Sequence, residues 1–273
     1  MDVIIRSRRL WWSGGDWLEL WRYRELFWTL AWRTILVHYK QTVVGVAWAL
    51  IRPLLTMLIF TVIFGKLAKL PAGNVPYPLL VFAAVLPWQF FANSLTESSN
   101  SVVAHAGMIN KIYFPRMIIP AAAVISGLID FGLAFIAFIG LMAWYGVVPG
   151  SQIVFLPFFL LLAFCTAFGA GLWLSALNVR FHDVRIIVPF LVQLGLYISP
   201  VGFSSTVVPA RWHWLYALNP MVGVIDGFRW CLLGQGAPTL GTGFWLSVMI
   251  AILMLAGGIV FFSRMERTFA DVI

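Results

Sequence analysis

The residues of this 273-residue chain with the most chemical potential are charged side chains set inside long apolar runs. Asp130 lies near the middle of the run 117–145, where ionising a carboxylate against lipid costs several kcal/mol. It must therefore face protein, water or a partner charge, either as a functional group or as a hydrogen-bonded carboxyl that holds helices together. Arg52, beside Pro53, either snorkels to the membrane surface from the first span or lines a pathway.

Patterns of familiar enzymes are missing from the sequence. It lacks the phosphate-cradling G-x-x-x-x-G-K-[ST] loop, so we expect no ATP hydrolysis on this chain. It also lacks G-x-S-x-G, H-E-x-x-H and Cys/His zinc patterns, and its carboxylates are too scattered for a two-carboxylate site. Cys165, Cys231 and His105 have no metal-spaced neighbours. We therefore expect no catalytic residue, metal or cofactor on this chain.

The composition is typical of an integral membrane protein. Apolar residues make up 62% of the chain and charged residues only 10%, against about 25% charged residues in a soluble domain. Apolar runs of roughly 20 residues, enough to cross a bilayer, alternate with short polar stretches. The fold predicted is all-α, with one membrane domain over 43–262, preceded by a cytoplasmic and interfacial segment, 1–42, and followed by a cytoplasmic tail, 263–273. The six predicted spans are 43–64, 77–92, 117–145, 153–177, 186–203 and 244–262.

The basic residues predict the orientation of these spans. Thirteen of the 18 Lys and Arg residues fall on the side that holds both termini, so that side is predicted to be cytoplasmic. The net charge is +8, and the basic residues that produce it lie beside the spans. Anionic lipid headgroups are a nearer partner there than nucleic acid. We expect membrane lipids, and no nucleic acid, as partners of these charges.

The segment 16–41 is predicted to form an amphipathic helix in the headgroup plane on the cytoplasmic side. A helix packed on neighbouring protein is the alternative. Its polar residues recur every three or four positions: Glu19, Arg22, Glu25, Thr29 and Arg33. Its apolar residues include Trp17, Leu20, Trp21, Trp28, Trp32, Ile35 and Leu36.

Two further segments between spans have features of their own. Residues 98–116 are predicted to be a short cytoplasmic helix capped by Ser98, Ser99 or Asn100 and stopped by Pro115, serving as a docking surface or a plain connector. Residues 204–243 are too long for a turn and too apolar for a solvated loop. We expect this stretch to dip back into the membrane as the outer vestibule of a pathway, with loose packing on the outer leaflet as the alternative.

Six short stretches resemble the permeases of polysaccharide-exporting ABC transporters, which move O-antigen, capsule or teichoic acid chains. The resemblance covers nearly the whole chain, and the stretches are specific together but weak one by one. They are YKQTVVGVAWALIRP (39–53), LPW (86–88), KIYFPR (111–116), LNVR (177–180) with Asp183, SPV (199–201) and LNPM (218–221).

The resemblance implies an architecture and a set of partners. The family has six spans per subunit, an interfacial helix, a cytoplasmic coupling helix and re-entrant outer helices between spans five and six. It works as two permease subunits with two separate ATPase subunits, which bind ATP and Mg. The coupling residues expected here are Ala104, His105, Met108, Ile109, Lys111 and Tyr113.

The function implied is export of lipid-linked polysaccharide, O-antigen first, across the bacterial cytoplasmic membrane. Aromatic rings suit such a path because they stack on the apolar faces of sugar rings. The residues expected to line the path are Trp88, Phe91, Trp173 and Tyr197, with Asp130 and Arg52. The alternatives are an ion- or proton-coupled secondary transporter that uses Asp130, and a membrane-embedded glycolipid enzyme, for which no cluster of acids or histidines is found.

Overall fold

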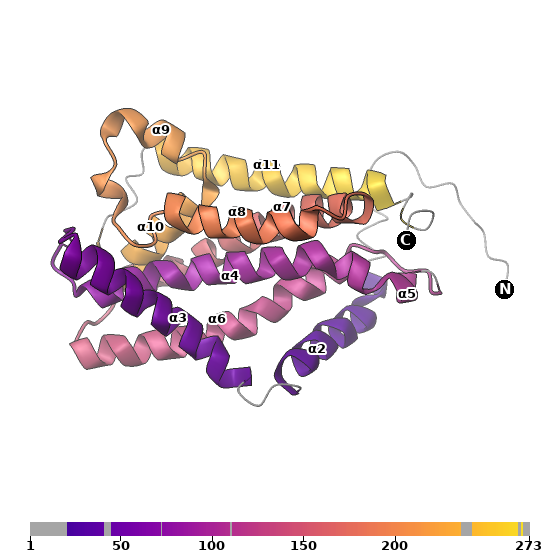
Figure 1. Ribbon diagram of the computed structural model, residues 1–273, viewed down its shortest axis with the longest axis horizontal. Coiled ribbons are helices and arrows are strands. Elements are labelled where there is room, and N and C mark those ends of the chain that lie inside the picture. Colours follow the sequence, from indigo (N-terminus) through magenta and orange to yellow (C-terminus); the bar gives the residue numbers. More distant parts are fainter. Residues whose placement is uncertain are drawn as a thin grey trace.

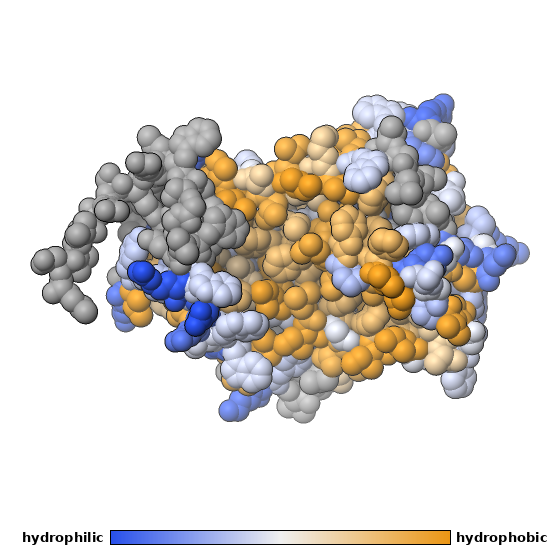
Figure 2. Space-filling view, turned by 180° about the vertical axis from the view of Figure 1, so that it is seen from behind, coloured by the Kyte–Doolittle hydropathy of each residue, from blue (hydrophilic) through white to orange (hydrophobic). Residues whose placement is uncertain are grey.

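The computed structural model describes residues 21–40, 45–71, 73–109, 111–235, 242–266 and 269, and these contain helices and no strand. Five of the described helical segments are long and apolar enough to cross a membrane, and in Figure 1 the long helices run along the longest axis. They are Ala47–Leu67, Tyr77–Ala104, Ile118–Tyr145, Ser151–Arg180 and Gly243–Met265. Figure 2 shows hydrophobic residues over the middle of one face and hydrophilic residues toward its two ends. The prediction of an all-helical, multi-span membrane protein is confirmed.

The fifth predicted span, 186–203, is shorter in the structure. Helix α8 covers Val184–Ile198, only 15 residues, or roughly 22 Å at about 1.5 Å per residue. The helix ends because Ser199 precedes Pro200 and takes an extended conformation (φ −79°, ψ 153°), as expected of a residue before proline. The predicted end at 203 is therefore wrong.

Helix α4 (Tyr77–Ala104) is the buried centre of the fold and packs against α3 (Gly45–Phe60), α6 (Ile118–Tyr145), α7 (Leu156–Arg180), α8 and α10 (Pro220–Leu233). Its inner face joins the main apolar core, where Phe82 meets Phe138 edge to face at 5.6 Å. Burial of such aromatic and aliphatic side chains is the main packing contribution in this layer.

The helix predicted over 98–116 does not exist as one unit. Ser98 and Ser99 are buried inside α4, which continues to Ala104, so the predicted caps are wrong. Asn178 of α7 packs against this part of α4, where its Nδ2 donates to Ser99 O at 2.9 Å and to Asn100 Oδ1 at 3.1 Å. After α4 the structure describes one short helix, α5 (Ala106–Ile109).

Helices α7 and α11 (Thr242–Met265) cross at glycines. A Cβ on Gly169 would lie 2.6 Å from the backbone N of Leu255, and one on Gly258 would lie 2.5 Å from Gly169 O. Small residues at a crossing let two backbones approach closely, which is a main source of helix association within membranes. Trp173 stacks on Phe261 at 4.4 Å beside this crossing.

Helix α2 (Arg24–Lys40) provides the described part of the predicted amphipathic helix; residues 16–20 and 41 lie outside the described residues. Leu30 and Ala31 are buried in a second core formed with α6, α7 and α11. Trp21, Trp28 and Trp32, which lie before and within α2, are exposed. One face is thus packed on neighbouring protein, as the alternative reading expected, while its exposed indoles have the amphipathic character of interfacial residues.

The segment after α8 returns into the helical bundle. It contains η3 (Ser205–Val207), η4 (Ala210–Trp212), α9 (His213–Tyr216) and α10, and α10 is buried against α4, α7 and α11. Asn219 caps α10 by accepting a hydrogen bond from Met221 N at 3.0 Å, and Gly234 ends it at φ 65°. Loose packing is therefore wrong for α10, while Trp212 and Trp214 remain exposed.

Candidate functional site

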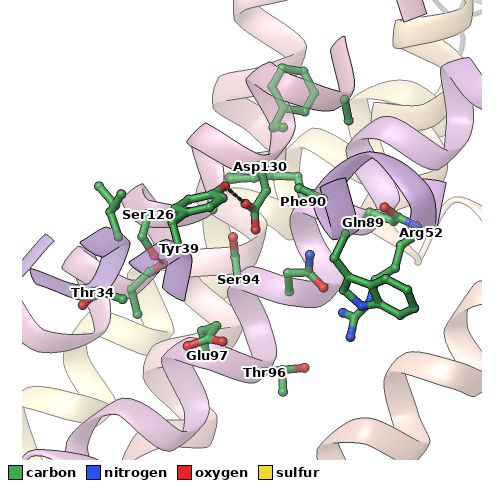
Figure 3. A pocket seen from close by; sticks show the side chains of 18 of the residues that line it. Thr34, Tyr39, Arg52, Gln89, Phe90, Ser94, Thr96, Glu97, Ser126 and Asp130 are labelled. Atoms are coloured by element: carbon green, nitrogen blue, oxygen red, sulfur yellow. Dashed lines mark hydrogen bonds between the residues drawn. The ribbon is translucent and has the colours of Figure 1, made fainter. Parts of the chain in front are cut away.

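A cavity of about 290 Å³ lies between four helices, α2, α3, α4 and α6 (Figure 3). Each helix contributes residues spaced by about four positions, so they share one face of that helix. Its polar and aromatic lining includes Thr34 and Tyr39 of α2, Trp48 and Arg52 of α3, Gln89, Asn93, Ser94 and Glu97 of α4, and Ser126 and Asp130 of α6. We call this cavity the inner pocket.

Asp130 and Tyr39 join two helices across the pocket. The Tyr39 hydroxyl donates a hydrogen bond to Asp130 Oδ1 (Figure 3), and the two residues are 91 positions apart in the sequence. Burial of the phenol, then the hydrogen bond and the negative charge of Asp130, raise the pKa of Tyr39. Tyr39 therefore stays protonated and donating at physiological pH. The hydrogen-bonded role expected of Asp130 has this partner, and its carboxyl also faces the cavity.

Arg52 lies at the same pocket, on α3. Its guanidinium carbon is 5.7 Å from the centre of the Trp48 ring, within cation–π distance. Pro53 stands inside α3, which starts at Gly45. Arg52 thus occupies a position that lines a cavity, while its side chain remains exposed.

Ser94 is a buried polar group with an incomplete environment. Its Oγ has no hydrogen-bond partner among the described residues, and Figure 3 shows the side chain directed toward Asp130. Gly127 makes room for it, since a Cβ on Gly127 would lie 2.6 Å from Ser94 Oγ. An unpaired buried hydroxyl costs about 1–3 kcal/mol, so such a group in a native fold calls for an explanation.

The other residues expected along a substrate path lie elsewhere. Among the described residues that line the inner pocket, Trp88, Phe91, Trp173 and Tyr197 are absent. Trp88 is buried 5.6 Å from Phe91 and would touch a Cβ on Gly195 of α8. Tyr197 is exposed, with its ring 6.3 Å from that of Phe60. The structure therefore brings Arg52 and Asp130 to one pocket. Trp88 of α4 instead packs against α8, and Tyr197 is part of α8.

The residues expected to couple to a partner split into two groups. Ile109 is only 5% exposed and packs in the second core, and Met108 is half-buried. His105 is half-buried with its Nδ1 2.8 Å from Ser101 O. Ala104, Lys111 and Tyr113 are exposed, Tyr113 by 71%, and Ile112 beside them is also exposed. In Figure 1 this turn, beside α5, lies at the same end of the molecule as the last turn of α11.

The sequence interpretation missed most of the inner pocket. Gln89, Asn93 and Glu97 form a polar stripe at four-residue spacing on α4, a signal visible in the sequence. The second predicted span ended at 92 or a little beyond, so Asn93 and Glu97 fell at its end and were not read as part of a site. The pairing of Tyr39 with Asp130 has no local signal, because it joins separate segments.

Comparison with known proteins places this geometry in context. Residues 25–233 match the family described as ABC-2 type transporter. The chain is 28% identical over 244 residues to the O-antigen export system permease protein RfbA of Klebsiella pneumoniae, covering 87% of this chain and 90% of the relative. It is 26% identical to RfbA of Myxococcus xanthus, covering 91% and 96%. It is 23% identical to the polysialic acid transport protein KpsM of Escherichia coli, covering 71% and 76%.

Proposed function

Because the chain belongs to the ABC-2 type transporter family, we propose that it is the permease subunit of an ATP-driven exporter that carries lipid-linked polysaccharide across the bacterial cytoplasmic membrane. The observation that carries this proposal is the likeness to two O-antigen export permeases over at least 87% of the chain. O-antigen is the first candidate substrate, and the likeness to a polysialic acid transport protein favours a polysaccharide in general. Capsule and teichoic acid chains follow.

The end of the molecule that carries α5 is proposed to face the cytoplasm. If the helices cross the membrane in turn, four arginines fall on the side of α5: Arg116 before α6, Arg180 at the end of α7, Arg185 at the start of α8 and Arg264 at the end of α11. This placement agrees with the positive-inside rule. Both termini then lie in the cytoplasm. Helix α8 is proposed to serve as the fifth of six spans, and α10 with α9 re-enters from the outer side, where its backbone is shielded by protein.

ATP hydrolysis is assigned to a separate subunit in two copies, which binds ATP and Mg, since this sequence lacks a phosphate-binding loop. The exposed turn with Lys111, Ile112 and Tyr113 is the proposed contact. An apolar and aromatic pair beside a cation has the character of a docking site. Buried Ile109 acts on this contact by fixing the base of the turn.

A second copy of the chain is proposed to complete the path. The inner pocket, at about 290 Å³, is too small for a polymer to pass. Helices α3 and α8 instead expose apolar side chains and meet at Phe60 and Tyr197. A broad apolar face of this kind fits a subunit interface. A channel between two such faces would place the exposed Tyr197 near the polymer, with Trp88 buried behind it.

The experiment that tests this function combines a genetic and a biochemical readout. Deletion of the chain's gene should leave polysaccharide in the cytoplasm, and the wild-type gene should restore it to the cell surface. The tagged chain, extracted in mild detergent, should carry an ATPase subunit in equal amount. Normal surface polysaccharide in the deletion strain would overturn the proposal.

Replacement of the exposed Tyr113 by Ala separates ATP-coupled export from secondary transport. The variant should assemble with the ATPase yet lose most of its export, because a docking anchor typically contributes more than about 1 kcal/mol. Tyr145→Ala at the opposite end of α6 is the matched control. If export is unchanged in Tyr113→Ala but stops when the proton gradient is collapsed, the secondary transporter is favoured.

A further inference from the structure

The inner pocket offers an unusual mixture of chemical groups for a membrane domain. Gln89 and Asn93 present amides, Glu97 and Asp130 present carboxyl groups, and Arg52 presents a guanidinium. Together they supply both donors and acceptors at several points around a small volume. A ligand that matches this set carries many groups able to donate and accept at once, which is a property of sugar hydroxyls.

The charges of the pocket argue against other ligands. It holds two carboxyl groups and one guanidinium, so a phosphate would meet more negative than positive charge. The described residues contain no cluster of three His, Cys, Asp or Glu side chains that could hold a metal ion. The polar lining therefore favours a ligand without net charge.

Trp48 adds a flat apolar surface beside these polar groups. It is exposed at the edge of the pocket, with Arg52 over its ring. One indole face suits the apolar C–H face of a pyranose, while amide and carboxyl groups bind the hydroxyls at its edge. The combination of one exposed indole with a polar wall from α4 is what distinguishes this pocket from the apolar surfaces of α3 and α8.

Ser94 supplies an independent sign of a ligand. Its hydroxyl is fully buried, has no partner among the described residues, and is directed into the pocket next to Asp130 (Figure 3). A buried hydroxyl left unpaired is destabilising unless something completes its hydrogen bonds. Only a glycine at position 127 admits this hydroxyl, because a Cβ there would lie 2.6 Å from Ser94 Oγ.

We propose that the inner pocket is a saccharide-binding site, which holds a sugar unit at the end of the polymer while the chain is loaded from the cytoplasmic side. This proposal rests on the proposed export function, and it names the recognition site for that substrate. The cavity of about 290 Å³ is at the lower limit of small-molecule sites, about 300–1,000 Å³, which suits a short part of a glycan. Arg52 and Glu97 are the exposed charged side chains of its lining.

The test measures binding directly and separately from export. The permease–ATPase complex is reconstituted in lipid nanodiscs. The probe is the phosphate-free oligosaccharide repeat released by mild acid from the strain's own polysaccharide. Trp48→Ala and Asn93→Ala should each weaken equilibrium binding about tenfold, the loss expected when one stacking or hydrogen-bonding contact of about 1.4 kcal/mol is removed. Glu97→Gln should weaken probe binding several-fold. Because it keeps the shape of an exposed side chain, it tests the pocket even if the other two variants misfold.

Matched controls lie outside the pocket. Trp212→Ala removes an indole of similar exposure (48%, against 49% for Trp48) in the segment after α8, and Glu25→Gln removes an exposed carboxylate on α2. Both should bind the probe like the wild type. Inorganic diphosphate is added as a competitor and should displace little of the oligosaccharide.

The outcomes separate the pocket from the function. A wild type that exports polysaccharide while Trp48→Ala, Asn93→Ala and Glu97→Gln bind the probe normally would overturn the pocket and leave the function intact. Strong displacement by diphosphate, with binding lost only in Arg52→Ala, would overturn it in favour of a phosphate headgroup. A wild type that exports no polysaccharide would remove the function and the pocket with it.

Discussion

Two polar regions at different positions along α4 show what a charge can do inside an apolar bundle. Near the end with α9 and α10, Arg229 is 4% exposed and donates to the carbonyls of Leu80 at 3.1 Å, Phe203 at 2.9 Å and Val201 at 3.1 Å. Asp226, one turn before it, supplies opposite charge. We call this set the Arg229 clamp. In the inner pocket, by contrast, Ser94 has an unpaired hydroxyl and Arg52 remains exposed.

The difference between the two regions is one of hydrogen-bond completeness. The Arg229 clamp pairs three donor nitrogens with backbone carbonyls, two of them in the turn that follows α8. A fully paired network of this kind fixes one conformation. The inner pocket has donors and acceptors around an open volume, which suits exchange of a ligand. The clamp thus stabilises the fold, and the pocket is the better candidate for binding a substrate.

The largest effect is expected from breaking the Arg229 clamp. Arg229→Ala removes three hydrogen bonds to backbone carbonyls and leaves Asp226 without its opposite charge, which should lower the free energy of unfolding by about 3–5 kcal/mol. The thermal midpoint of the purified protein, followed by fluorescence-detected gel filtration, measures it. Arg211→Ala, an exposed arginine of the same outer segment, is the control. An unchanged midpoint in Arg229→Ala would show that the clamp does not stabilise the fold.

A smaller effect is expected from the bond between α2 and α6. Tyr39→Phe removes the donor to Asp130, a hydrogen bond to a charged group worth about 1.5–3 kcal/mol. Hydrogen exchange of residues 24–40 should rise while the core of α4 stays protected. Tyr145→Phe, at the far end of α6, should change neither region. Exchange in α2 that is indifferent to Tyr39→Phe would mean that other contacts hold this helix.

Asp130→Asn sharpens the comparison further, since an amide oxygen still accepts from Tyr39. We expect α2 to stay in place and polysaccharide export to fall less than about threefold, because a neutral acceptor replaces only part of the interaction. Surface polysaccharide and ATPase activity, measured on the same variant, give the amount of polysaccharide exported per ATP hydrolysed. Complete loss of export with intact assembly would assign proton or ion coupling to this carboxyl.

Much of the fold could be predicted from sequence, because hydropathy reports burial in lipid directly. The end of α8 could also have been predicted from Ser199 before Pro200. Arg229 could not, since the sequence shows a charge in an outer segment and not the three carbonyls that approach it from α4 and 201–203. The pocket was half visible: Asp130 and Arg52 stand out in apolar runs, whereas Ser94 and Tyr39 acquire meaning only when distant helices meet.

The smallest effect, and the sharpest contrast, is expected from a pair of buried serines. Ser94→Ala removes a hydroxyl with no partner among the described residues, so it should leave the thermal midpoint unchanged or raise the free energy of unfolding by about 1 kcal/mol. Ser175→Ala removes a buried hydroxyl that donates to Leu172 O at 3.1 Å, and it should lower stability by a similar amount. Equal destabilisation by both would show that Ser94 is already paired in the unliganded protein, and the contrast between an open pocket and a complete clamp would fail.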